Sequence, residues 1–250
     1  MAKPAKSERQ AKIDAIRKQQ KGADKRRGYA IVAVCGVIAA AIIAVPLYGI
    51  ISDEVASSQY SSLAIDEIGA PADVCGEVTT EPAADSGTHV PQEQQVTYDT
   101  SPPAFGPHWN IAGVAPVSGA REFYTADDRP EIEALVHNQE HGYTVLWYDE
   151  TIADDDEALG EVRGIAEKFS DESNRRNAFI AAPWTSEDGD AFPDGQHVAM
   201  THWSAGGAGE TDTANQVGVW QYCAEPSGAA VEEFVTEYPQ QDSPEPNAFL

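Results

Sequence analysis

The chain has 250 residues, of which 42% are hydrophobic and 23% charged, and this composition excludes a wholly disordered protein. Its formal net charge of −25 argues against non-specific nucleic-acid binding as the main function. The charge is unevenly distributed, because residues 1–27 hold ten basic and three acidic residues, whereas residues 52–250 hold six and thirty-eight.

Residues 28–51 form an uncharged segment of twenty-four positions between these two regions. As a helix the segment would be about 36 Å long at ~1.5 Å per residue, enough to cross a bilayer with some tilt. A cleaved signal peptide is the alternative, but its apolar core of about 7–15 residues and its small-residue cleavage site fit this segment poorly. The ten preceding basic residues predict a cytoplasmic N-terminus and place residues 52–250 outside the cell membrane.

Four parts are therefore expected along the chain. Residues 1–27 are a basic cytoplasmic tail, which is expected to contact anionic lipid headgroups and not nucleic acid. Residues 28–51 are a single transmembrane helix, and residues 52–72 are a polar stalk rich in small residues. Residues 73–250 are an extracytoplasmic α+β domain.

The outer region contains two cysteines, Cys75 and Cys223, one near each end of the domain. An even pair in an oxidising compartment predicts a disulfide, worth about 4–5 kcal/mol at most in the chain-entropy model. Thiolate metal ligation is the alternative, but the two residues lack CxxC spacing.

Apolar periodicity in the outer domain predicts four strands and three helices, with one element left open. The residues before Gly142 suit a helix with Pro130 near its start, although two strands also fit. The elements are expected, in chain order, at Val96–Thr100 (strand), Asp128–His141 (helix), Tyr143–Tyr148 (strand), Asp154–Phe169 (helix), Ala178–Ala182 and His197–Trp203 (strands) and Ala229–Tyr238 (helix). This order implies one small mixed or antiparallel sheet with helices mainly on one face.

All six histidines lie in the outer region, and His137 and His141 are four positions apart. On a helix both rings could share one metal ion, whereas along a straight strand they would be about 13 Å apart. A hairpin turn at Gln139–Glu140 would also bring them together. The spacing alone leaves these arrangements open.

A metal site is one interpretation of these histidines. The candidate ligands are His108, His137 and His141, with His89 as a fourth and Glu140 as an outer partner, and the candidate ions are Cu and Zn. HNQEH also matches the HxxEH pattern of inverted zinc peptidases, and Met200 with His202 could offer a soft Cu(I) set. The alternatives are a loop cluster whose imidazoles bond to the backbone, and a core role for Met200.

Several motifs combine here: YDTSPPAFGPHWN, VHNQEHG before an aromatic strand, THW, and a C-terminal F…Y…PEP tail. Together they resemble the bacterial family known as domain of unknown function 3105, over roughly Cys75 to Pro246. The resemblance implies an extracytoplasmic protein, membrane-anchored or secreted, and implies no activity. Its pattern picks out Cys75, His89, Pro102, Pro103, Gly106, His108, His137, Glu140, His141 and Gly142. Many members read LTAW where this chain reads MTHW, so Met200 and His202 depart from the pattern.

Two functional classes remain: a membrane-tethered module that binds Cu or Zn, with an envelope or respiratory protein as partner, and a metal-free envelope interaction protein. An enzyme comes third, as an HxxEH zinc hydrolase. The sequence shows no nucleophile elbow, phosphate loop or dinucleotide fingerprint.

Overall fold

The computed structural model describes residues 59–118, 120–170 and 178–248, with residues 31–43 and isolated positions between 10 and 29. The strands are β1 (Thr79–Pro82), β2 (His89–Val90), β3 (His108–Trp109), β4 (Thr144–Tyr148), β5 (Phe179–Pro183), β6 (Val198–Ser204) and β7 (Val217–Cys223). The helices are α2 (Ile132–Glu140), α3 (Glu150–Ala153), α4 (Asp156–Glu167) and α5 (Gly228–Glu237), with 3₁₀ turns at η1 (Ile65–Glu67), η2 (Ala72–Val74) and η3 (Thr213–Asn215).

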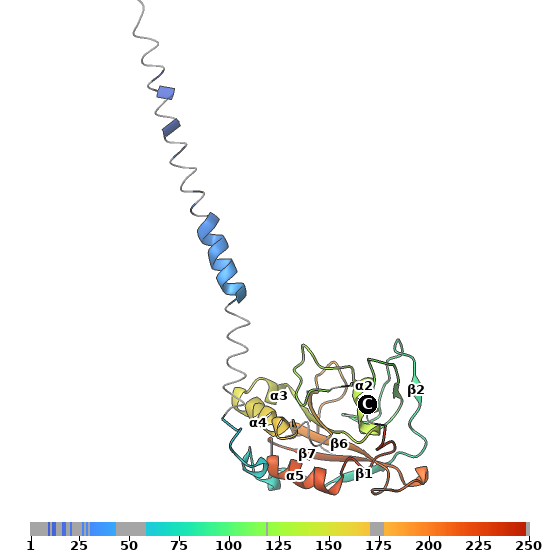
Figure 1. Ribbon diagram of the computed structural model, residues 1–250. Coiled ribbons are helices and arrows are strands. Elements are labelled where there is room, and N and C mark those ends of the chain that lie inside the picture. The colour runs from blue at the N-terminus through green and yellow to red at the C-terminus, as the bar shows by residue number, and fades with distance from the viewer. Residues whose placement is uncertain are drawn as a thin grey trace, which may run out of the picture. The chain divides into compact units, whose positions relative to one another are not determined.

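Five strands form one mixed sheet in the order β1-β7-β6-β4-β5 (Figure 1). Only β4 and β5 run parallel in this sheet, and the other neighbouring strands are antiparallel. A parallel pair needs a crossover connection, and α3 and α4 provide it between β4 and β5. This arrangement confirms the predicted α+β fold with a mixed sheet.

One face of the sheet, here called the helical face, packs against α3, α4 and α5. The apolar stripe predicted on α4 is present, since Val162, Ile165 and Ala166 are fully buried. The acidic residues at the start of α4 act as a cap, because the Asp155 carboxylate accepts hydrogen bonds from the backbone N–H groups of Glu157 and Ala158. Local sequence therefore accounts for this layer.

The opposite face packs against α2 and the loops before it. Leu135 of α2 joins an apolar cluster with Val145 and Trp147 of β4. In Figure 1, α2 and α5 lie on opposite sides of β6 and β7. Of the helices α2 to α5, three thus share one face, and α2 covers the other.

The packed domain begins before Asp73, where the stalk was expected to end. Ile68 is fully buried in the core of the helical face, and its carbonyl accepts a hydrogen bond from the N–H of Gly228. Tyr60 packs against the same core. The stalk prediction is therefore wrong for this stretch, because a small, polar composition concealed apolar anchors.

Cys75 and Cys223 form the predicted disulfide, with their Cα atoms 3.9 Å apart. The bond joins the segment before β1 to the end of β7, where the two residues also form an isolated β-bridge. It closes a loop with a sequence separation of 148. A disulfide of this kind persists in oxidising compartments.

The strand predicted at Val96–Thr100 is wrong, because this stretch is irregular. Side chains occupy its hydrogen-bonding groups: the N–H of Val96 donates to Glu133 Oε1, at 2.7 Å. The Tyr98 hydroxyl donates to the carbonyl of Pro107, at 2.8 Å. Strands β1 and β7 were not predicted, although β7 is an interior strand of the sheet, between β1 and β6.

Within the described residues, no helix combines the length and the apolar character needed to cross a membrane. Residues 31–43 are helical, and residues 44–51 of the predicted span lie outside the described residues, as does most of the predicted tail over residues 1–27.

Candidate metal centre

Helix α2 settles the conformation of HNQEH, for which the sequence allowed a helix or two strands. His137 and Glu140 occupy its last turn. The helix ends at Glu140, and Gly142 follows with φ +93°, a conformation that favours glycine. A Cβ at Gly142 would clash with the carbonyl oxygen of Gln240, so the C-terminal segment also requires glycine here.

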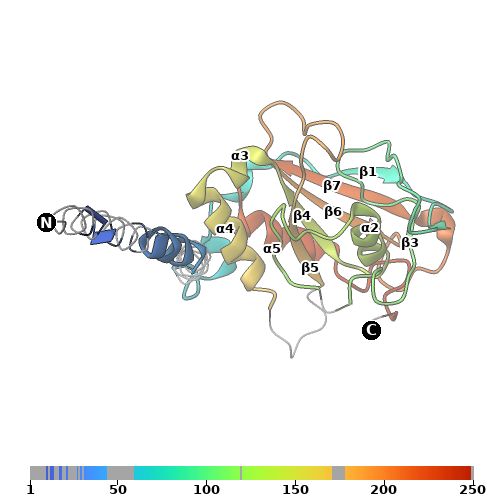
Figure 2. The same cartoon turned by 90° about the horizontal axis from the view of Figure 1, so that it is seen from above.

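The loop SPPAFGPHWN places a second histidine beside α2. It leads into β3, which pairs in parallel with β2 so that His89 lies opposite His108. Figure 2 shows β3 beside α2. The ring centroids of His108 and His137 are 4.7 Å apart, and those of His89 and His108 are 5.0 Å apart. Phe105 and Trp109, on the same loop, pack into apolar clusters.

Four side chains, here called the histidine cluster, come together at this point. They are His89, His108, His137 and Glu140, and their ligand atoms all lie within 4.8 Å of one another. Glu140 Oε2 is 3.1 Å from His108 Nε2, 3.7 Å from His137 Nε2 and 3.9 Å from His89 Nε2. The cluster is buried apart from His89, whose side chain is 47% exposed.

Backbone carbonyls orient the two buried imidazoles. His108 Nδ1 donates to the carbonyl of Gly106 at 2.9 Å, and His137 Nδ1 donates to the carbonyl of Trp109 at 2.5 Å. Because a carbonyl only accepts, each of these rings carries a proton on Nδ1, and its Nε2 is directed to Glu140. Metal-binding histidines have this same outer hydrogen bond.

Burial and the neighbouring His108 lower the pKa of His137 to about 4, so this ring is neutral at pH 7. Burial alone would raise the pKa of Glu140, but its interactions with His108, His137 and His89 outweigh that effect and lower it. The cluster at neutral pH therefore combines a carboxylate with an imidazole lone pair.

Two atoms of the cluster are buried without a hydrogen-bond partner, namely His108 Nε2 and Glu140 Oε2. The two atoms are 3.1 Å apart, and with the His108 proton on Nδ1 they present a lone pair and a carboxylate oxygen to each other. Burying such facing acceptors is costly, and a cation between them would remove the cost. Ligands at about 2.1 Å from a tetrahedral metal are about 3.4 Å from each other. The distances from Glu140 Oε2, between 3.1 and 3.9 Å, bracket that value. The residues present thus fit a metal ion.

His141 lies outside this group, although the sequence placed it among the ligands and Glu140 behind them. Its ring centroid is 4.7 Å from that of His137, and its Nε2 is 3.5 Å from Glu245 Oε2. His141 therefore lies beside His137 at the end of α2, and its ring nitrogen is directed to Glu245 and not to the cluster. The structure groups Glu140 with the other three histidines.

Two other candidates from the sequence do not join the cluster. Met200 is buried in the core of the helical face, as its alternative core role predicted. His202 is fully buried and donates from Nε2 to the carbonyl of Asp242, at 2.6 Å. The sixth histidine, His197, pairs with Asp149 at 2.8 Å.

Sequence reasoning missed Glu245 and the carbonyl acceptors. The N–H of Glu245 donates to the carbonyl of Glu140 at 2.9 Å, which brings the C-terminal segment to the end of α2. Apolar periodicity carries no signal for such a contact, and backbone carbonyls have no sequence signature at all. The PEP motif of the C-terminal tail contains Glu245, but the sequence analysis used this motif only as part of the family resemblance.

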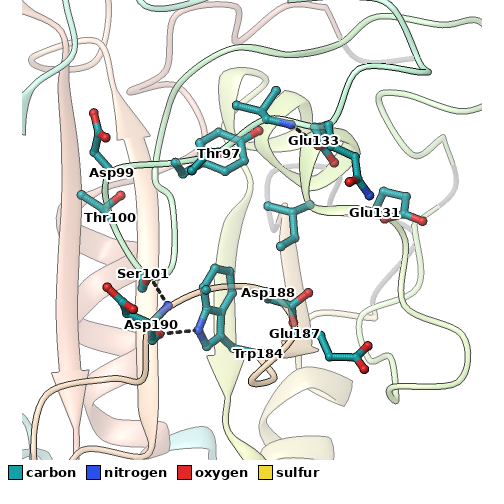
Figure 3. A pocket seen from close by; sticks show the side chains of 15 residues that line it. Thr97, Asp99, Thr100, Ser101, Glu131, Glu133, Trp184, Glu187, Asp188 and Asp190 are labelled. Atoms are coloured by element: carbon teal, nitrogen blue, oxygen red, sulfur yellow. Dashed lines mark hydrogen bonds between the residues drawn. The ribbon is translucent and has the colours of Figure 1, made fainter.

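A separate cavity of about 380 Å³ lies at the other end of α2 (Figure 3). Its wall includes Glu131, Glu133, Trp184 and Asp190, and none of its lining residues belongs to the histidine cluster. The N–H of Asp190 donates to the Ser101 hydroxyl, and the Trp184 indole donates to the Asp190 carbonyl. These bonds hold the residues of the cavity wall in place, and neither bond involves the histidine cluster.

Comparison with known proteins gives one match. A family model described as "Protein of unknown function (DUF3105)" matches residues 89–249. This range begins at His89 and contains the whole histidine cluster. No curated protein and no solved structure matches the chain.

Proposed function

The chain belongs to the DUF3105 family, and from that premise we propose that it is a metal-binding domain whose histidine cluster holds one divalent transition-metal ion. One observation carries the proposal. Buried His108 Nε2 and buried Glu140 Oε2 lie 3.1 Å apart, and neither has any other hydrogen-bond partner. A cation bound between them would satisfy both groups.

The donor set favours particular ions. Three imidazole nitrogens and one carboxylate oxygen suit Zn²⁺ or Cu²⁺, whereas Cu(I) prefers sulfur ligands. Met200, the methionine considered for a soft site, lies in the core of the helical face. We therefore propose Zn²⁺ or Cu²⁺ as the occupant.

A binding role agrees with the geometry better than the HxxEH hydrolase reaction. In that reaction the glutamate activates water while both histidines of the motif bind zinc. Here Glu140 lies among the ligand atoms, and His141 is directed to Glu245. A metal-free interaction protein is the competing function.

We also propose that the domain functions outside the cell membrane, tethered by residues 28–51, near an envelope or respiratory partner. The disulfide between Cys75 and Cys223 supports an oxidising location. The basic residues before the uncharged segment support a cytoplasmic N-terminus. Protease digestion of spheroplasts should remove the domain, and its protection would contradict this topology.

Metal content tests the binding function. The full chain should be purified without a histidine tag, dialysed, and measured by elemental mass spectrometry. We expect about one Zn or Cu per chain, and a loss of at least tenfold in His108→Ala and His137→Ala.

His197→Ala is the matched control, because it removes an imidazole that pairs with Asp149 and does not belong to the cluster. This variant should keep the metal. Metal-free wild-type protein after loading with Zn²⁺ and Cu²⁺, or equal metal in all variants, would overturn the proposal.

A further inference from the structure

We propose that the domain binds a second divalent metal ion beside the histidine cluster, and that Glu140 bridges the two ions. The second site, here called the outer site, consists of Glu140, His141 and Glu245. The inference rests on the proposed function, because the bridging carboxylate belongs to both groups.

The ligand atoms of the outer site lie close enough to share an ion. One atom from each residue lies within 4.8 Å of the others. His141 Nε2 and Glu245 Oε2 are 3.5 Å apart, near the ~3.4 Å expected between two ligands of a tetrahedral ion. Zn²⁺ accepts this combination of one imidazole and two carboxylates.

Glu140 stands between the two sites because of how α2 ends. His137 is in its last turn and His141 directly follows it, and their rings are edge to face. Glu140 lies between them in the chain, and its Oε2 is directed to the histidine cluster, 3.1 Å from His108 Nε2 and 3.7 Å from His137 Nε2. A carboxylate has two oxygens and about four lone-pair positions, so one ion does not exhaust it.

The C-terminal segment holds Glu245 at this place. The N–H of Glu245 bonds to the carbonyl of Glu140, and the Gln240 amide donates to the carbonyls of His141 and Pro246. Asp242 accepts hydrogen bonds from the N–H groups of Ala205 and Gly207. Glu245 therefore extends from an anchored backbone and not from a free tail.

The two sites should differ in affinity. The histidine cluster offers four ligands with two buried imidazoles, whereas the outer site offers three ligands and the Glu245 side chain is 52% exposed. An ion with three protein ligands keeps an open position for water or an anionic group. We expect the ion at the outer site to be lost on dialysis and the ion in the histidine cluster to remain.

Titration of the dialysed full chain with Zn²⁺ in a calorimeter tests the inference. Wild type should start with one ion and take up one further equivalent. Glu245→Gln and His141→Ala should keep the first ion and weaken the second binding event at least tenfold. Glu232→Gln, an exposed acidic residue of α5, is the matched control and should titrate as wild type does.

The outcomes separate the two proposals. Wild type that keeps one ion and binds no second would overturn the outer site and leave the proposed function intact. Equal titration of wild type and Glu245→Gln would also overturn it. Dialysed protein that never held the first ion would overturn the proposed function itself.

Discussion

Helices α4 and α2 show how differently the two faces of the sheet are built. On α4 the fully buried residues are small or apolar, and its charged residues are exposed or half-buried. On α2 eight consecutive residues are buried, from Glu133 to Glu140, and five of them are polar. A polar buried helix needs a partner for each side chain.

Those partners come from distant segments of the chain. Glu133 accepts from the N–H of Val96, Asn138 pairs with the backbone of Val117, and Gln139 donates to the carbonyl of Pro103. His137 and Glu140 are the residues of α2 that belong to the proposed metal site. Apolar packing thus stabilises the helical face, whereas hydrogen bonds on the other face position the proposed ligands.

The largest expected effect is the loss of stability in Phe234→Ala, on the helical face of the sheet. Phe234 is 2% exposed in the core of the helical face, so its truncation should lower the free energy of unfolding by about 3–5 kcal/mol. Urea denaturation would measure the change. Metal content per folded chain should stay at the wild-type value.

The exposed neighbour Glu233 supplies the control, since Glu233→Ala should shift the free energy of unfolding by less than about 0.5 kcal/mol. Loss of metal from folded Phe234→Ala protein would show that the two faces are coupled and end the division of roles.

Gly142→Ala affects the other face and should have an intermediate effect. The new Cβ meets both a left-handed backbone and the carbonyl of Gln240, so we expect a loss of about 1–3 kcal/mol. The displaced C-terminal segment should also weaken Zn²⁺ binding at the outer site.

Gly113→Ala separates the effect of backbone strain from the effect of displacing the C-terminal segment. Gly113 also has a positive φ, +79°, but a Cβ there has no neighbour within 4 Å. This control should lose stability without any change in Zn²⁺ binding, and similar metal affinities in both variants would argue against the role of the C-terminal segment.

The smallest expected effect is a pH dependence on the helical face. Burial, together with Glu157, Glu225 and Asp155, raises the pKa of Glu161 to about 7. The folded state therefore binds more protons than the unfolded state between about pH 4.5 and 7. Stability should fall as the pH rises through this window, by under about 1 kcal/mol after solvent screening.

Glu161→Gln should remove this slope, which denaturation at pH 5 and pH 8 would detect. Glu167→Gln on the exposed side of α4 should retain it. An unchanged slope in Glu161→Gln would mean that another group titrates.

Prediction from the sequence succeeded where the signal is local. The stripe on α4 repeats with the helical period, and the short strands β4, β5 and β6 are fully buried runs, of which β4 is rich in β-branched and aromatic residues. It failed at Val96–Thr100, because side chains from α2 and the Pro107 loop compete for the groups that a strand would use.

The sequence by itself indicated the disulfide partners, the α+β class, the family and four candidate histidines, three of which lie in the cluster. These features depend on residue type, spacing and motif. Only the tertiary structure decided that Glu140 replaces His141 in the cluster and that Glu245 approaches it. The physical reason is that ligand geometry depends on where α2 ends and on how the C-terminal segment docks, and both follow from contacts between residues far apart in the chain.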